Sequence, residues 1–132
     1  MNPKLASLAM LAALVATPAL AFTPEELIQR HLDFMAKGDA NGIANDFAPD
    51  GAAVFGATAA VGRDAIRAQF AKMVSSPATR AIKGDKVWSE KNVGFLQWSA
   101  GPVHGVDVFV TQGDKILSQS AFVAAPPPAA AK

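Results

Sequence analysis

The hydrophobic period of this chain changes once, near residue 79. Between residues 23 and 74, apolar residues recur at helical spacing, interrupted by one short apolar strand. After residue 79, segments with strand character follow one another and are separated by short turns. Helices followed by a run of strands predict an α+β fold, in which the helices pack on one face of a curved antiparallel sheet.

The first 21 residues have the pattern of a secretory signal peptide. Lys4 supplies the positive charge, residues 5–16 are apolar, and residues 19–21 (ALA) form a small-x-small cleavage site. An uncut membrane anchor is the less favoured alternative, because the apolar run is shorter than the roughly 20 residues that a spanning helix needs. We therefore expect cleavage before Phe22 and a periplasmic or secreted location.

The charge balance of the mature chain limits its partners. Residues 1–21 contain one Lys and no acid, which leaves 11 Lys plus Arg and 11 Asp plus Glu. A neutral chain without a basic cluster is not expected to bind nucleic acid or, once the signal is removed, an acidic membrane surface. The chain also has no cysteine, so packing without disulfides must hold the domain together.

The helical part has clear boundary signals. Residues 23–26 (TPEE) combine an N-cap threonine, a proline at the first helical position and a capping-box glutamate. Phe22 and Leu27 stand where a hydrophobic staple would close, and Gly38 ends the helix. Its apolar stripe contains a histidine and consists of Leu27, Ile28, His31, Phe34 and Met35. His31 is therefore expected on the buried face.

The remaining elements follow from local patterns. Residues 39–47 predict a short helix, 49–51 a turn and 52–55 a strand, and a second amphipathic helix follows residues 62–64. Its apolar stripe is Ile66, Phe70, Met73 and Val74. Later strands are expected at residues 79–90, 93–100, 103–110 and 115–123. The Ala- and Pro-rich tail, 124–132, is expected to be disordered, which leaves residues 22–123 as one domain.

The order and spacing of several motifs resemble the nuclear transport factor 2-like (NTF2-like) superfamily. The resemblance covers residues 23–123 and is closest to the polyketide-cyclase-like (SnoaL-like) and ketosteroid-isomerase-like members. The motifs that carry it are RHL at residues 30–32, KGD at 37–39, FAPDG at 47–51, VGRDAI at 61–66, DVF at 107–109 and GDKI at 113–116. The resemblance implies a cone, in which the sheet wraps around an interior pocket and the helices close one side.

Asp107 is the leading candidate for a site residue. It interrupts an otherwise apolar strand, and alternation places it on one face with Val103, Gly105 and Phe109. An aspartate on the solvent face, paired with a lysine, is the alternative. The resemblance implies a pocket carboxyl, which ketosteroid isomerases hold neutral to donate a hydrogen bond and cyclase-like relatives use as an acid or base.

The resemblance also bears on His31 and Phe55. His31 falls where the isomerases place a phenol donor, and this chain has no tyrosine. Two interpretations remain open. His31 is an acid or base that can pair with Asp107 by a hydrogen bond, or it is a core histidine bonded to a neighbour or at a subunit contact. Phe55 stands where an isomerase would have its catalytic aspartate. Steroid isomerisation is therefore not expected.

Other side chains are candidates for contact with a ligand. Gln119, flanked by Leu117 and Ala121, is placed either to orient a ligand carbonyl or to pair across strands. Trp88 and Trp98 either line the pocket or fill the core. The expected ligand-binding residues are Phe34, Phe55, Trp98, Phe109 and Gln119.

No metal or cofactor is expected. His31 and His104 are the only histidines and lack ligand spacing, and no glycine-rich phosphate loop occurs. Three functions remain open. The first is an exported domain that binds a small apolar molecule in a mainly apolar pocket. The second is an isomerase, dehydratase or cyclase that moves protons with Asp107 and His31. The third is a non-catalytic interaction domain that forms a homodimer.

Overall fold

The computed structural model describes residues 21–124, and the fold is an α+β cone. Nearly all of the expected export signal and of the expected disordered tail lies outside the described residues. In chain order, the elements are α1 (Pro24–Lys37), α2 (Ala40–Asp46), β1 (Phe47–Phe55), β2 (Thr58–Val61), α3 (Arg63–Val74), α4 (Pro77–Arg80), β3 (Lys83–Glu90), β4 (Val93–Ala100), β5 (Val103–Gln112) and β6 (Lys115–Val123).

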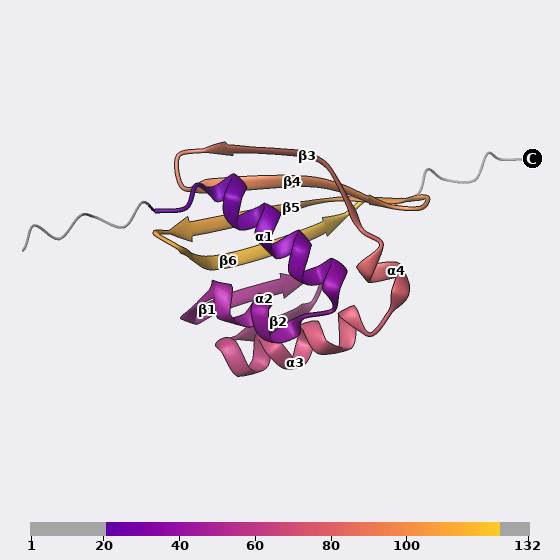
Figure 1. Ribbon diagram of the computed structural model, residues 1–132, viewed down its shortest axis with the longest axis horizontal. Helices are drawn as coiled ribbons and strands as arrows, with labels where there is room; N and C mark the ends of the chain where they lie inside the picture. The colour runs from indigo at the N-terminus through magenta and orange to yellow at the C-terminus, as the bar shows by residue number, and fades with distance from the viewer. Residues whose placement is uncertain (1–20, 125–132) are drawn as a thin grey trace, which may run out of the picture.

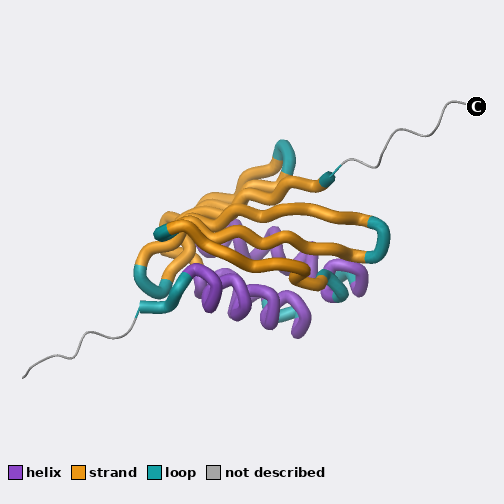
Figure 2. Tube along the Cα trace, turned by 90° about the horizontal axis from the view of Figure 1, so that it is seen from above, coloured by secondary structure: helices purple, strands orange, loops and turns teal. Residues whose placement is uncertain are grey.

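The strands form one curved sheet, and the helices cover one of its faces (Figures 1 and 2). The strand order is β2-β1-β6-β5-β4-β3. β3 to β6 form an antiparallel meander, as expected from their short turns. β1, however, pairs with β6 in parallel, so the expected antiparallel sheet is in fact mixed. Periodicity could not reveal this pairing, because the two strands are far apart in the sequence.

The start of α1 confirms the predicted capping box. The backbone N–H of Thr23 donates to Glu26 Oε2 at 2.8 Å, and the N–H of Glu26 donates to Thr23 Oγ1 at 3.2 Å. Gly38 ends the helix with a φ of 71°, a backbone conformation that glycine adopts without strain. Phe22 is 42% exposed, and its ring lies under the guanidinium of Arg30.

The region around β1 and α4 differs from the expectation. The predicted turn at residues 49–51 lies inside β1, where the pairing with β6 shifts register between Phe47 and Ala52. The short strand β2 and the one-turn helix α4 were not predicted. Pro77 begins α4 and delays β3, which starts at Lys83 rather than at residue 79.

A bulge in β6 sets the direction of Gln119. Val110 pairs with Ser118 but Thr111 pairs with Ile116, so Leu117 is an extra residue. The bulge interrupts the alternation of faces, and Ile116 and Gln119 are both buried although they are three residues apart. Leu117 therefore does not share the buried face of Gln119, contrary to the simple alternation assumed from the sequence.

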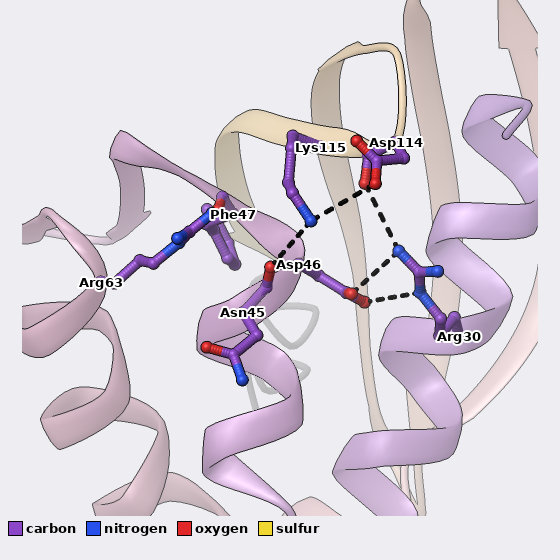
Figure 3. A network of polar contacts seen from close by, with 7 residues as sticks. All are labelled: Arg30, Asn45, Asp46, Phe47, Arg63, Asp114 and Lys115. Carbon is purple, nitrogen blue, oxygen red and sulfur yellow. Dashed lines mark hydrogen bonds and ion pairs between the residues drawn. The ribbon is translucent and has the colours of Figure 1, made fainter. Parts of the chain in front are cut away.

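An ion pair joins α1 to α2, and hydrogen bonds connect both helices to the start of β6 (Figure 3). Arg30 on α1 contacts both carboxylate oxygens of Asp46 on α2, at 2.9 and 3.1 Å. Arg30 also donates to the backbone oxygen of Asp114, and Lys115 donates to the backbone oxygen of Asn45. Burial raises the pKa of Asp46, and the hydrogen bond and charge of Arg30 oppose that rise.

Candidate functional site

A cavity of about 320 Å³ lies between the helices and the sheet. It is near the lower end of the size range of small-molecule sites. Of the side chains that line it within residues 21–124, three are polar: Thr79, Asp107 and Gln119. The others are Leu32, Met35, Phe55, Phe70, Met73, Ala78, Ile82, Leu96, Trp98, Ala100, Val103, Ala121 and Val123. The cavity is therefore apolar, with polar groups concentrated on β5 and β6.

Asp107 lies in this cavity wall with both carboxyl oxygens engaged. The indole Nε1 of Trp98 donates to Oδ1 at 2.8 Å, and the amide Nε2 of Gln119 donates to Oδ2 at 2.8 Å. The three side chains come from β4, β5 and β6, which are neighbours in the sheet. Alternation along β5 predicted the inward direction of Asp107 correctly, and the solvent-facing alternative was wrong, since Asp107 is 6% exposed.

The environment of Asp107 acts on its pKa in two opposed ways. Burial among apolar side chains raises the pKa, because the charged form loses hydration. The hydrogen bonds from Gln119 and Trp98 oppose this rise, because they stabilise the carboxylate. The rise from burial is the larger, so the pKa of Asp107 lies above its ordinary value.

His31 is fully buried behind the cavity wall rather than in it. Its ring packs edge-on against Phe70 and Phe109, at 5.4 Å from each ring centre. Burial lowers its pKa from 6.5 to about 4, so the imidazole is neutral near pH 7. His31 Nε2 lies 3.4 Å from Nε2 of Gln119, which also donates to Asp107. Gln119 thus lies between His31 and Asp107, and the two residues do not form the direct hydrogen bond that the sequence left open.

Two atoms of this cluster lack a hydrogen-bond partner within the described chain. They are Oε1 of Gln119 and Nδ1 of His31, and both are buried. If the amide of Gln119 donates to His31 Nε2, the neutral imidazole must have its proton on Nδ1. Buried polar atoms are nearly always satisfied in folded proteins. Oε1 of Gln119 and Nδ1 of His31 are exceptions among the described residues, and both lie behind the cavity surface.

The other predicted ligand contacts divide into two groups. Phe55 and Trp98 line the cavity. Phe34 and Phe109 are not among the lining side chains: Phe34 packs over Gly42, and Phe109 packs against His31. Trp88 pairs with Phe95 and stacks on it, on the sheet face away from the helices. Most of the aliphatic lining was not predictable from the sequence, because an apolar residue in a cavity wall has the same sequence pattern as one in a solid core.

The described residues contain neither a metal-binding cluster nor a membrane-spanning helix. Between residues 21 and 124, no three His, Asp or Glu side chains gather closely enough to hold a metal ion. No helix in the same range is long and apolar enough to cross a membrane.

The architecture, a helical layer on a curved mixed sheet, is that of the NTF2-like class. The sequence matches the family model of the SnoaL-like domain over residues 28–119. The chain therefore belongs to the SnoaL-like family of the NTF2-like superfamily, as the sequence motifs suggested. No curated protein matches the sequence.

Solved structures share the fold at low sequence identity. A protein from Sphaerobacter thermophilus has 19% identity and a TM-score of 0.65, over 82% of this chain and 100% of that one. A hypothetical protein with a ketosteroid isomerase-like fold from Catenulispora acidiphila, in complex with trimethylamine, has 18% identity and a TM-score of 0.64, over 76% and 86%. An NTF2-like protein from Burkholderia xenovorans has 16% identity and a TM-score of 0.65, over 79% and 84%. These likenesses support the fold alone.

Proposed function

We propose that this protein is an exported domain that binds a small, mainly apolar molecule in the cavity between the helices and the sheet. The observation that carries the proposal is the contrast in the cavity wall, which is apolar except for Thr79, Asp107 and Gln119. Binding to such a wall is favourable because it removes the apolar surface of the ligand and of the wall from water, and the few polar groups orient the bound molecule. Export rests on the signal pattern of residues 1–21.

One further observation supports binding over a purely structural cluster. Asp107 lines the cavity and each of its carboxyl oxygens accepts one hydrogen bond, so a lone pair on each remains for a ligand that donates to it.

The test is a binding screen with cavity-filling variants. Small apolar compounds that raise the melting temperature of the purified protein are titrated by calorimetry. Ala121→Phe places a ring in the cavity and is expected to abolish binding, because Ala121 lines the wall. Ala71→Phe is the matched control, since Ala71 lies on the exposed face of α3. Equal affinity of both variants for the ligand would contradict the cavity as the binding site.

A second candidate function is proton transfer by Asp107, in an isomerase, dehydratase or cyclase type of reaction. The observation in its favour is the raised pKa of a carboxyl that lines an apolar cavity, an arrangement that suits a general acid or base. His31 is not proposed as the partner acid, because it is fully buried behind the wall and neutral. Gln119, rather than His31, is the polar neighbour that a substrate would reach.

Turnover of enolisable ketones, lactones and epoxides tests this second candidate. If Asp107 transfers the proton, the pH profile of turnover follows its ionisation, and Asp107→Asn abolishes turnover. Trp98→Phe keeps the carboxyl but removes one donor, so the pH profile should move to higher pH. Turnover that persists in Asp107→Asn would refute this role.

A further inference from the structure

We propose that the molecule bound in this cavity is a small alkyl amine in its protonated form, whose N–H group donates to the carboxylate of Asp107. The inference rests on the binding function proposed above and adds the chemical class of the ligand. It follows from four properties of the wall: used donors, free acceptors, an uncompensated carboxylate and aromatic lining.

The strong donors beside the cavity are already used. The indole N–H of Trp98 and the amide N–H of Gln119 both point to Asp107, one to each carboxyl oxygen. Each carboxyl oxygen of Asp107, a residue that lines the cavity, retains a further lone pair. This cluster therefore offers acceptors to a ligand. A molecule that brings N–H groups fits it. A carbonyl finds no free donor at Asp107, and among the described side chains that line the cavity the hydroxyl of Thr79, on α4, is the donor left for it.

The carboxylate of Asp107 also lacks a cation. No Lys, Arg or His is among the described side chains that line the cavity, and none of the ion pairs found within residues 21–124 involves Asp107. A carboxylate in an apolar site is unstable without an opposite charge, even when neutral donors contact it. A bound ammonium supplies both that charge and the missing donors. The charge-assisted hydrogen bond is stronger than one to an alcohol.

The aromatic side chains suit the rest of such a ligand. Phe55, Phe70 and Trp98 line the same cavity as Asp107. Their rings cover alkyl groups, and their faces attract a cation electrostatically. An alkylammonium thus meets apolar surface around its carbon atoms and a carboxylate at its nitrogen.

The competing arrangement requires Asp107 to be neutral. If the amide of Gln119 is rotated by half a turn, its oxygen faces Asp107 and its N–H group takes the buried position without a partner. Oδ2 of Asp107 must then have a proton to donate, and neutral His31 must have its proton on Nε2. A neutral ligand such as a ketone would suit that state better than an ammonium, because Asp107 then has no charge to compensate. The two arrangements therefore predict opposite ligand preferences, which matched probes distinguish.

The experiment compares probes of equal shape on the purified full chain. Cyclohexylmethylamine, cyclohexylmethanol and cyclohexyl methyl ketone are titrated by calorimetry at about pH 8, where an alkylammonium of pKa near 10.4 remains charged. The amine is expected to bind at least about ten-fold more tightly than the alcohol, and the ketone most weakly. Lowering the pH should weaken binding of the amine as Asp107 becomes protonated. His31, which contacts Gln119, is the other titratable side chain that this cluster touches among the described residues.

Asp107→Asn serves as the paired variant. It should lose most of the affinity for the amine and retain that for the alcohol, which also shows that the variant folds. The comparison of probes on the unaltered protein decides the question even if this variant fails to fold. Tighter binding of the ketone than of the amine would overturn the ammonium proposal and leave the binding function in place. No binding of any probe would overturn both.

Discussion

The indole Nε1 of Trp98 donates a 2.8 Å hydrogen bond to Oδ1 of Asp107, although the two residues are not paired across their strands. Trp98 pairs with Gly105, and Asp107 pairs with Leu96. The contact is therefore a diagonal one, across two residues of β5. It is made possible by Gly105, because a side chain there would occupy the space of the Trp98 ring.

Gly105→Ala should be strongly destabilising for this reason. The added Cβ would collide with Cζ2 and Cε2 of Trp98 and would lie 2.7 Å from the backbone oxygen of Phe122. Overpacking of this kind costs about 1–3 kcal/mol, and here it also displaces the donor to Asp107. Urea denaturation measures the loss. In the control Gly101→Ala, the Cβ meets no atom, and a φ of 59° costs about 1–2 kcal/mol. A smaller loss for Gly105→Ala than for this control would contradict the argument.

Trp98→Phe should raise the pKa of Asp107. The hydrogen bond from Trp98 stabilises the carboxylate and lowers its pKa, so its removal leaves burial less opposed. The variant should also lose about 1–3 kcal/mol of stability, because a buried acceptor loses its donor. A carbon-13 NMR titration of the Asp107 carboxyl measures the pKa. Trp88→Phe, on the opposite sheet face, is the control and should leave the titration of Asp107 unchanged.

The stability of the protein should depend on His31 between pH 6.5 and about 4. The folded state lowers its pKa, so over this range the unfolded chain binds a proton that the folded chain does not. This contribution is fully present above pH 6.5 and is lost as the pH falls to about 4. Its full size is about 3 kcal/mol.

His31→Leu isolates that contribution. The raised pKa values of Asp46 and Asp107 act in the opposite direction, since their protonated forms are favoured in the folded state. The difference in unfolding free energy between the two proteins, measured at several pH values, largely removes those contributions. As the pH falls from 6.5, the unfolding free energy of the unaltered protein should decrease relative to that of His31→Leu. A difference that is constant with pH would show that His31 is not buried as a neutral group.

Arg30→Met should cost about 3 kcal/mol of stability. It leaves the buried carboxylate of Asp46, whose side chain is 8% exposed, without its cation. Arg67→Met is the control, because Arg67 pairs with Asp64 on the surface, where the Asp64 side chain is 99% exposed. The control should cost less than about 1 kcal/mol. Equal losses in chemical denaturation would contradict the structural role of the Arg30–Asp46 pair.

Local signals in the sequence predicted the parts of the fold that local physics decides. The capping box at Thr23 and the glycine at position 38 predicted the two ends of α1, and the alternation of residues along β5 predicted that Asp107 points inward. The parallel pairing of β1 with β6 was not predictable in this way, because it joins distant segments. The strand β2 was not predictable because its four residues, TAAV, show no clear alternation of polar and apolar side chains.

The candidate site was predictable in its residue types but not in its connections. Asp107, Gln119 and Trp98 were each identified from the sequence as residues with a possible pocket role. Their hydrogen bonds depend on the register of three strands and on the bulge at Leu117. A direct hydrogen bond between His31 and Asp107 was one of the interpretations left open by the sequence, but the fold places Gln119 between them. Strand register and helix depth are tertiary properties, which spacing along the chain does not contain.

Proton–nitrogen NMR of the two tryptophan indole N–H groups tests the binding proposal most directly. Trp98 lines the cavity and donates to Asp107, whereas Trp88 stacks on Phe95 at the opposite face of the sheet. Titration with cyclohexylmethylamine should therefore shift the indole signal of Trp98 progressively and leave that of Trp88 in place. An unchanged Trp98 signal at saturating amine, or an equal shift of both signals, would contradict a ligand site at Asp107.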